Sequence, residues 1–160
     1  MKKQKNNILL IFILTIILFI LISAYIIQYK LGHEPCNLCL YERIPYILST
    51  LLLIRILFFK KYKKVILLII SIVFIISTIL AFYHFGIEQD FFEESLVCKT
   101  TNLSETLNKE QLLEELKQKS VSCKYVSFKI LGFSLATINT IFSFLLSVIF
   151  MRLFINYGKN

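Results

Sequence analysis

Four long apolar stretches, separated by short polar or charged segments, dominate the pattern of this 160-residue chain. Residues 6–29 and 130–151 carry no charge, residues 65–87 carry one titratable histidine, and residues 40–59 carry an arginine towards each end. About 20 apolar residues cross a bilayer, and in lipid the backbone must satisfy its polar groups within each segment. The pattern therefore predicts an all-α membrane protein, a bundle of four transmembrane helices.

Composition supports a membrane protein of one domain, residues 1–160. Hydrophobic residues make up 57% of the chain, and the mean hydropathy is +0.73. A soluble domain of this size could not bury so many Ile, Leu and Phe side chains. The uncharged stretch at 6–29 also exceeds the roughly 7–15 residues of a signal-peptide core, so we expect it to remain as the first span.

The positions of the lysines predict the orientation of the chain. The formal charge of +8 comes from residues beside the apolar stretches rather than from a basic face with interleaved aromatics, which argues against nucleic-acid binding. Two lysine clusters flank the spans, at 2, 3, 5 and at 60, 61, 63, 64. The positive-inside rule then places both termini in the cytoplasm. Residues 30–39 and the long loop 88–129 are expected outside.

A short helix is expected inside the long outer loop. Asn108 and Gln111 resemble a capping box, and three leucines that follow share one side. The helix could pack on the domain or lie in the membrane interface, and the sequence favours neither.

All four cysteines fall in the two outer segments, where disulfides form readily. Cys36 and Cys39 have the Cys-x-x-Cys spacing of redox motifs, and Pro35 before them favours a helix start. On such a helix Cys36, Cys39 and Arg43 share one face. The helix N-terminus and the Arg43 cation would both stabilise a thiolate, which is the attacking form in disulfide exchange.

Two other uses of these cysteines were weighed. Cys36 and Cys39 could be half of a zinc site, but Cys98 and Cys123 are 25 positions apart and supply no second Cys-x-x-Cys. Cys98 and Cys123 could instead form a purely structural disulfide. Their loop is polar and exposed in the predicted topology, which suits a pair that must meet another protein. Four cysteines allow three pairings, and the residues alone leave the pairing open.

Arg43 and His84 are ionisable groups at the outer ends of two spans, a placement that favours a functional role. A quinone head group is a planar dicarbonyl that needs hydrogen-bond donors at that depth, and these two side chains could supply them. Arg43 could alternatively extend to the lipid head groups. Pro45 should kink the second span or free a carbonyl near Tyr41.

At this point the motifs resemble a known family. The segment EPCNLCLYER at 34–43 is similar to the signature of the DsbB family of disulfide bond formation proteins. YHFGIEQ at 83–89 resembles the family's exit from the third helix, and LGFSLA at 131–136 resembles the start of its fourth. The resemblance runs from about residue 8 to 150 and keeps the order of both cysteine pairs.

The resemblance implies a quinone-dependent thiol oxidoreductase in the inner membrane of a bacterial cell. Such an enzyme reoxidises a soluble, thioredoxin-like DsbA oxidase and passes the electrons to ubiquinone or menaquinone. The reduced partner would attack Cys98, and Cys123 would exchange with Cys36. Cys39 would face the quinone. By position, the residues expected to hold the quinone are Arg43, His84 and Glu88.

Two further function classes remain open at this stage. A vitamin K epoxide reductase-like enzyme also combines a four-helix core, two cysteine pairs and a quinone, but it usually carries its Cys-x-x-Cys late in the chain. A membrane scaffold stapled by disulfides would need no turnover. Fixed disulfides that do not respond when quinone synthesis is blocked would identify the scaffold.

Overall fold

The computed structural model describes residues 2–59, 62–94, 98, 122–124, 129–130 and 132–157, with the backbone alone for 2–6 and 129–130. The helix expected near Asn108 lies outside these residues. The described part is mostly helical. Its elements, in chain order, are α1 (Lys2–Tyr29), α2 (Asn37–Tyr41), α3 (Arg43–Phe58), α4 (Lys63–Glu88), β1 (Lys129–Ile130), β2 (Phe133–Ser134) and α6 (Leu135–Tyr157).

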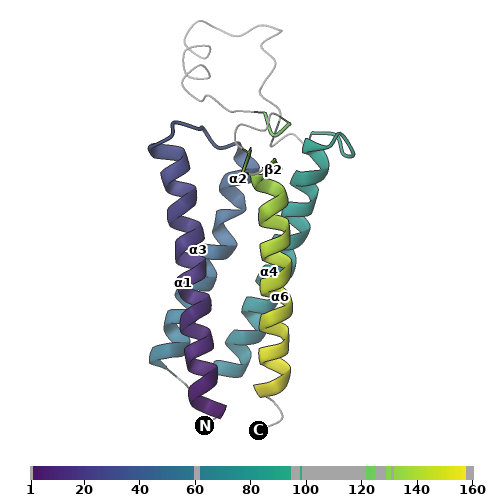
Figure 1. The fold of residues 1–160 in the computed structure, drawn as a ribbon. Coiled ribbons are helices and arrows are strands. Elements are labelled where there is room, and N and C mark those ends of the chain that lie inside the picture. Colours follow the sequence, from purple (N-terminus) through teal and green to yellow (C-terminus); the bar gives the residue numbers. More distant parts are fainter. Residues whose placement is uncertain are drawn as a thin grey trace, which may run out of the picture.

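The long helices run side by side (Figure 1). Both chain ends lie at one end of the molecule, while α2 and the small β1–β2 hairpin lie at the other. Helices α4 and α6 have the most extensive contact, and α3 contacts both α1 and α4. This arrangement gathers α2, the end of α4 and the start of α6 in one place.

Three of the described helices are long and apolar enough to cross a membrane: Asn7–Tyr29, Lys63–Glu88 and Leu135–Tyr157. Large apolar side chains cover their outward faces, among them Phe19, Ile79 and Phe144. Such continuous apolar surface is rare on soluble monomers and normal against lipid. The chain is therefore a multi-pass membrane protein, and the remaining apolar stretch at 40–59 contains α3, which has 16 residues.

The helix break before α3 follows from Pro45. Proline has no backbone N–H, so Pro45 cannot donate a hydrogen bond to the carbonyl of Tyr41, four residues earlier. Tyr41 ends α2, and α3 begins after the single residue Glu42. The predicted irregularity near Tyr41 is confirmed, and its consequence is that Glu42 occupies the joint between two helices.

Small polar residues hold α4 against α6. Ser77 Oγ lies 3.2 Å from Ser143 Oγ, and Ser71 donates to the backbone carbonyl of Ser147 at 3.4 Å. Small side chains let membrane helices approach closely, and their hydroxyls then bond across the interface. Between Ser71 and Ser77 on α4, the ring of Phe74 stacks on that of Phe150 with centroids 5.7 Å apart.

The last helix begins at Leu135 rather than at the expected Ile130. Strands β1 and β2 pair in antiparallel fashion, and Gly132 between them has a φ of +87°, a conformation that glycine adopts without strain. Ser134 then caps the helix, because its Oγ accepts a hydrogen bond from the Thr137 N–H at 3.2 Å. At its other end the helix continues to Tyr157, past the expected end at Met151.

Candidate redox site

The Cys-x-x-Cys pair sits at the start of α2. Cys36 is the N-cap residue, and its Sγ accepts a hydrogen bond from the Cys39 backbone N–H at 3.3 Å. Pro35 therefore precedes the cap instead of occupying the first helical position. One helical turn brings the two sulfur atoms to 2.7 Å, and both cysteines are free. The motif thus forms a close dithiol whose first sulfur faces the positive end of a helix.

The pKa values of the two thiols in this pair are shifted in opposite directions. The hydrogen bond from Cys39, with a smaller contribution from His84, lowers the pKa of Cys36 to about 5 although burial opposes the shift. The same hydrogen bond to Cys36, together with burial, raises the pKa of Cys39. Cys36 is therefore the sulfur that carries the negative charge in this state, with Cys39 as its donor.

The second pair forms a disulfide, Cys98–Cys123, with Cα atoms 5.3 Å apart. Both residues are almost fully buried and pack in one cluster with Cys36, Leu38 and Ile87. The sequence placed this pair in an exposed loop; the structure contradicts that expectation, because the apolar disulfide packs against side chains from α2 and α4. The two cysteine pairs are consequently neighbours.

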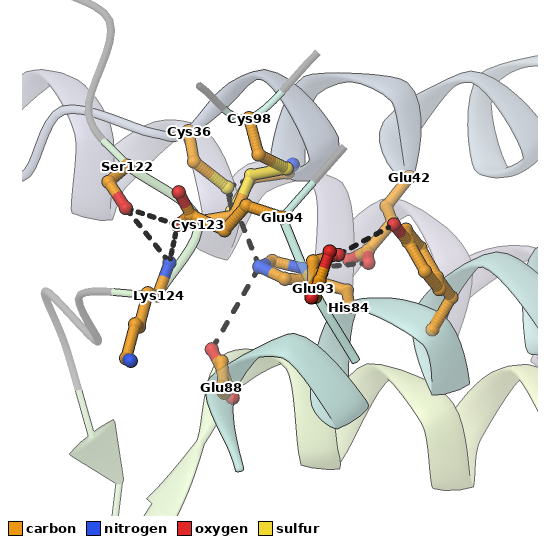
Figure 2. The surroundings of a disulfide bond; sticks show 12 residues. Cys36, Glu42, His84, Glu88, Glu93, Glu94, Cys98, Ser122, Cys123 and Lys124 are labelled. Carbon is orange, nitrogen blue, oxygen red and sulfur yellow. Dashed lines mark hydrogen bonds and ion pairs between the residues drawn. A yellow bond between two sulfur atoms is a disulfide. The ribbon is translucent and has the colours of Figure 1, made fainter. Parts of the chain in front are cut away.

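His84, near the end of α4, connects this cluster to two carboxylates (Figure 2). Its Nε2 atom lies 3.6 Å from Cys36 Sγ, and its Nδ1 atom lies 2.8 Å from Glu42 Oε1. Glu88, one turn further along α4, places Oε1 3.9 Å from Nε2. The imidazole is thus held between an acidic side chain on one edge and a thiol on the other.

Glu42 is the first member of a buried polar chain that the sequence analysis did not identify. Its Oε2 accepts a hydrogen bond from Asn139 Nδ2 at 2.7 Å. Tyr46 donates to Asn139 Oδ1 at 2.6 Å and lies 3.0 Å from Ser143 Oγ. The chain continues to Ser77 of α4, so it ties α3, α4 and α6 together beneath the cysteines.

The contacts of the Arg43 side chain are with α1 rather than with the sulfur atoms. Its guanidinium donates to Gln28 Oε1 at 2.6 Å and lies 5.1 Å from the centre of the Tyr25 ring, both on α1. The expected thiolate contact is therefore made by His84 in this structure, and Arg43 instead fastens α3 to α1. A guanidinium has five N–H donors, so this bond leaves it able to donate further.

A cavity of about 350 Å³ lies beside the Cys-x-x-Cys pair. Apolar side chains of α1 and α6 form most of its wall, while its polar groups gather at one end. All the site residues expected from the sequence except Cys98 line this cavity: Cys36, Cys39, Arg43, His84, Glu88 and Cys123. An elongated apolar molecule with a polar head would match this distribution.

A metal site was the main alternative for the first pair. Donor atoms of Cys36, Cys39 and His84 lie within 4.8 Å of one another. A closed structural zinc site uses four ligands, and among the described residues this group has three. Within the described part of the chain, this group is therefore one ligand short of a closed zinc site.

The missed residues had a signal in the sequence. Asn139, Ser143 and Ser147 recur every four positions in an otherwise apolar stretch, the spacing of one helix face. Glu42 is an ionisable group inside the second apolar stretch, which by itself favours a role. Only the fold shows that Glu42 points towards Asn139 and His84, residues from two other helices.

Comparison with known proteins gives one family. The model described as "Disulfide bond formation protein DsbB" matches residues 6–153, from α1 through most of α6. An uncharacterised protein of Rickettsia prowazekii (strain Madrid E) is 30% identical over 161 residues, which cover 99% of this chain and 93% of the relative. No solved structure matches. The matched range contains every residue of the site described above.

Proposed function

Because the chain belongs to the DsbB family of disulfide bond formation proteins, we propose that it reoxidises a soluble DsbA-like thiol oxidase and passes the electrons to a membrane quinone. The family resemblance of residues 34–43 is thereby confirmed, and membership implies a membrane disulfide oxidoreductase. The partner, the quinone and the role of each residue are our proposal.

The packing of the two cysteine pairs is the observation that carries this proposal. Cys98 and Cys123 share a cluster with Cys36, which in turn lies 2.7 Å from Cys39. Disulfide exchange requires a thiolate to reach a disulfide sulfur directly. The shared cluster therefore supports a route in which electrons that enter at the loop pair reach the cavity by exchange between the two cysteine pairs.

In the proposed sequence the thiolate of the reduced partner attacks Cys98, and Cys123 leaves as a thiolate. Cys123 attacks Cys36 of a Cys36–Cys39 disulfide, and Cys39 leaves as a thiolate beside the cavity. The partner's second thiol then displaces Cys98 and completes the partner's disulfide. Cys98 in turn displaces Cys36 from Cys123 and re-forms the Cys98–Cys123 disulfide. Every step forms one S–S bond and breaks one, so the two electrons of the partner dithiol move to the Cys36–Cys39 pair.

The cavity fits a quinone. Its apolar wall suits an isoprenoid tail, and at the polar end the Arg43 guanidinium and the His84 imidazole can donate to two carbonyl oxygens. Glu88 lines the same end. When bound there, the quinone supplies the acceptor for two electrons and two protons. Cys39 is the sulfur proposed to face it.

The proposed topology keeps both termini in the cytoplasm and both cysteine pairs outside the inner membrane. Both chain ends lie at the opposite end of the molecule from α2 (Figure 1), as an even number of crossings requires. The fourth crossing is the apolar stretch at 40–59, which contains α3 and has about the length that a bilayer needs.

Purified protein tests the proposal directly. With a reduced thioredoxin-like oxidase and a short-chain quinone in detergent, the loss of partner thiols should match quinone reduction. Cys39→Ser should lower the rate roughly 10³-fold or more, because it removes the sulfur next to the cavity. Thr50→Ser is the matched control. Thr50 does not line the cavity, and its hydroxyl donates to the Tyr46 carbonyl of its own helix. Full activity in Cys39→Ser, or thiol loss without quinone reduction, would sink the proposal.

A further inference from the structure

Glu42 is a buried carboxylate that the electron route does not use. It is 7% exposed and lies at the joint between α2 and α3. Each of its oxygens has a partner: Oε1 lies 2.8 Å from His84 Nδ1, and Oε2 accepts from Asn139 at 2.7 Å. A carboxylate in an apolar bundle is costly unless it has partners, so its placement calls for a role.

The contact with Glu42 determines which ring nitrogen of His84 carries the hydrogen. An ionised carboxylate only accepts hydrogen bonds, so the hydrogen between the two groups sits on Nδ1. The other ring nitrogen, Nε2, faces Cys36 Sγ at 3.6 Å. A neutral His84 in this tautomer presents a lone pair to the Cys36 thiol, and a protonated one presents a donor to the thiolate.

We propose that Glu42 is a positioning residue: through His84 Nδ1–H it holds the imidazole against Cys36, so that the Cys36 thiol gives its proton to His84 Nε2. The Cys36 S–H bond breaks, an N–H bond forms at Nε2, and a thiolate–imidazolium pair results. The use made of that thiolate rests on the proposed function; the proton transfer itself does not.

The thiolate serves two steps of the proposed exchange. A sulfur with a low proton affinity leaves faster, so Cys36 departs readily when a Cys36–Cys123 bond is broken. As a thiolate, Cys36 can also close the disulfide with Cys39. Oxidation of that dithiol releases two electrons and two protons to the quinone. His84 lines the same cavity as Cys39 and so holds one of those protons beside the acceptor.

The charged groups around His84 favour this arrangement. From the segment before α3 come the Cys36 sulfur and the Glu42 carboxylate, and from α4 itself comes Glu88, whose Oε1 lies 3.9 Å from Nε2. Helix α6 contributes Asn139 and β2 contributes Ser134, which are neutral partners of the two carboxylates. The Arg43 guanidinium donates to Gln28 of α1. An imidazolium is therefore flanked by negative groups.

A titration of Cys36 in the absence of quinone and partner tests the proposal. A Cys39→Ala background with the Cys98–Cys123 disulfide intact leaves Cys36 as the one free thiol of the chain. It also removes the hydrogen bond from Cys39, the largest cause of the lowered pKa of Cys36. The rate of reaction with iodoacetamide is then followed against pH. We expect a midpoint below the ordinary value of about 8.5.

Glu42→Gln in this background should raise the midpoint by about one pH unit or more, which means roughly tenfold slower alkylation below it. Glu42→Asp should recover part of the shift. Asn139→Ala is the matched control, because it removes the other partner of Glu42 and touches the same polar chain. It should move the midpoint much less than Glu42→Gln. Equal midpoints for Glu42→Gln and its parent, or equal shifts in Glu42→Gln and Asn139→Ala, would overturn the proposal.

A measurement without a Glu42 variant covers the case in which Glu42→Gln does not fold. The chain has two histidines, and His33→Gln leaves His84 as the one signal in a ¹⁵N-histidine spectrum. We expect Nδ1 of His84 to carry hydrogen across the pH range in which the protein is folded. An unprotonated Nδ1 would overturn the proposal. Either result stands whether or not quinone reduction is observed, so the two proposals can fail separately.

Discussion

Replacing both Cys98 and Cys123 by serine is expected to abolish oxidation of the protein partner, by roughly 10³-fold or more, while a small dithiol is still oxidised. In the proposed route a folded partner reacts at Cys98 of the loop pair, whereas Cys36 lies at the start of α2 beside the cavity and exchanges only with Cys123 and Cys39. Dithiothreitol is small enough to reach Cys39, which is only partly buried. Quinone reduction driven by each reductant, measured in parallel, gives the two rates.

Replacing both cysteines leaves no unpaired thiol in the loop that could form a disulfide with Cys36. Its matched control is the wild-type chain with the same two reductants, and both proteins should give dithiothreitol rates within about tenfold of each other. If the double variant oxidised the protein partner as fast as wild type, the loop disulfide would be a structural staple.

Truncation of Tyr46 to alanine is expected to lower the free energy of unfolding by about 3–5 kcal/mol. Tyr46 is 3% exposed, its ring meets Phe74 edge-on at 5.5 Å, and its hydroxyl bonds Asn139. Truncation leaves a cavity and two polar groups without their partner. Tyr46→Phe keeps the ring and should cost about 1 kcal/mol.

Unfolding in mixed micelles of increasing denaturing-detergent content measures both variants. A similar loss in Tyr46→Phe and Tyr46→Ala would mean that the hydroxyl contacts, rather than ring packing, dominate the stability of this region. A loss below about 1 kcal/mol in both would contradict the described core.

The sequence predicted the chemistry of the first cysteine pair better than its surroundings. Cys-x-x-Cys spacing determines that one helical turn brings two sulfurs together, whatever the rest of the fold does. Arg43, one further turn along, was expected to serve the same thiolate. The break that Pro45 causes lies between them, and Arg43 turns to Gln28 of another helix. Local spacing cannot anticipate a partner on a separate helix.

The apolar stretches predicted helices because lipid leaves the backbone no alternative, and three of them meet the length of a membrane span. The start of the last helix was misplaced because hydropathy does not register a hairpin. Gly132 and the Ser134 cap are the local features that set the start at Leu135. The contact between Glu42 and His84 lies beyond sequence reasoning altogether, since it depends on how α3 packs against α4.

The central claim, that the two cysteine pairs are linked to a quinone, is tested most directly by complete oxidation of the reduced chain without any partner. The chain is first fully reduced to four thiols and then mixed anaerobically with excess short-chain ubiquinone or menaquinone. Each disulfide releases two electrons, so we predict the loss of all four thiols, reduction of two quinones per chain, and disulfides at Cys36–Cys39 and Cys98–Cys123. Thiols that persist with both quinones, or that disappear without quinone reduction, would contradict the account.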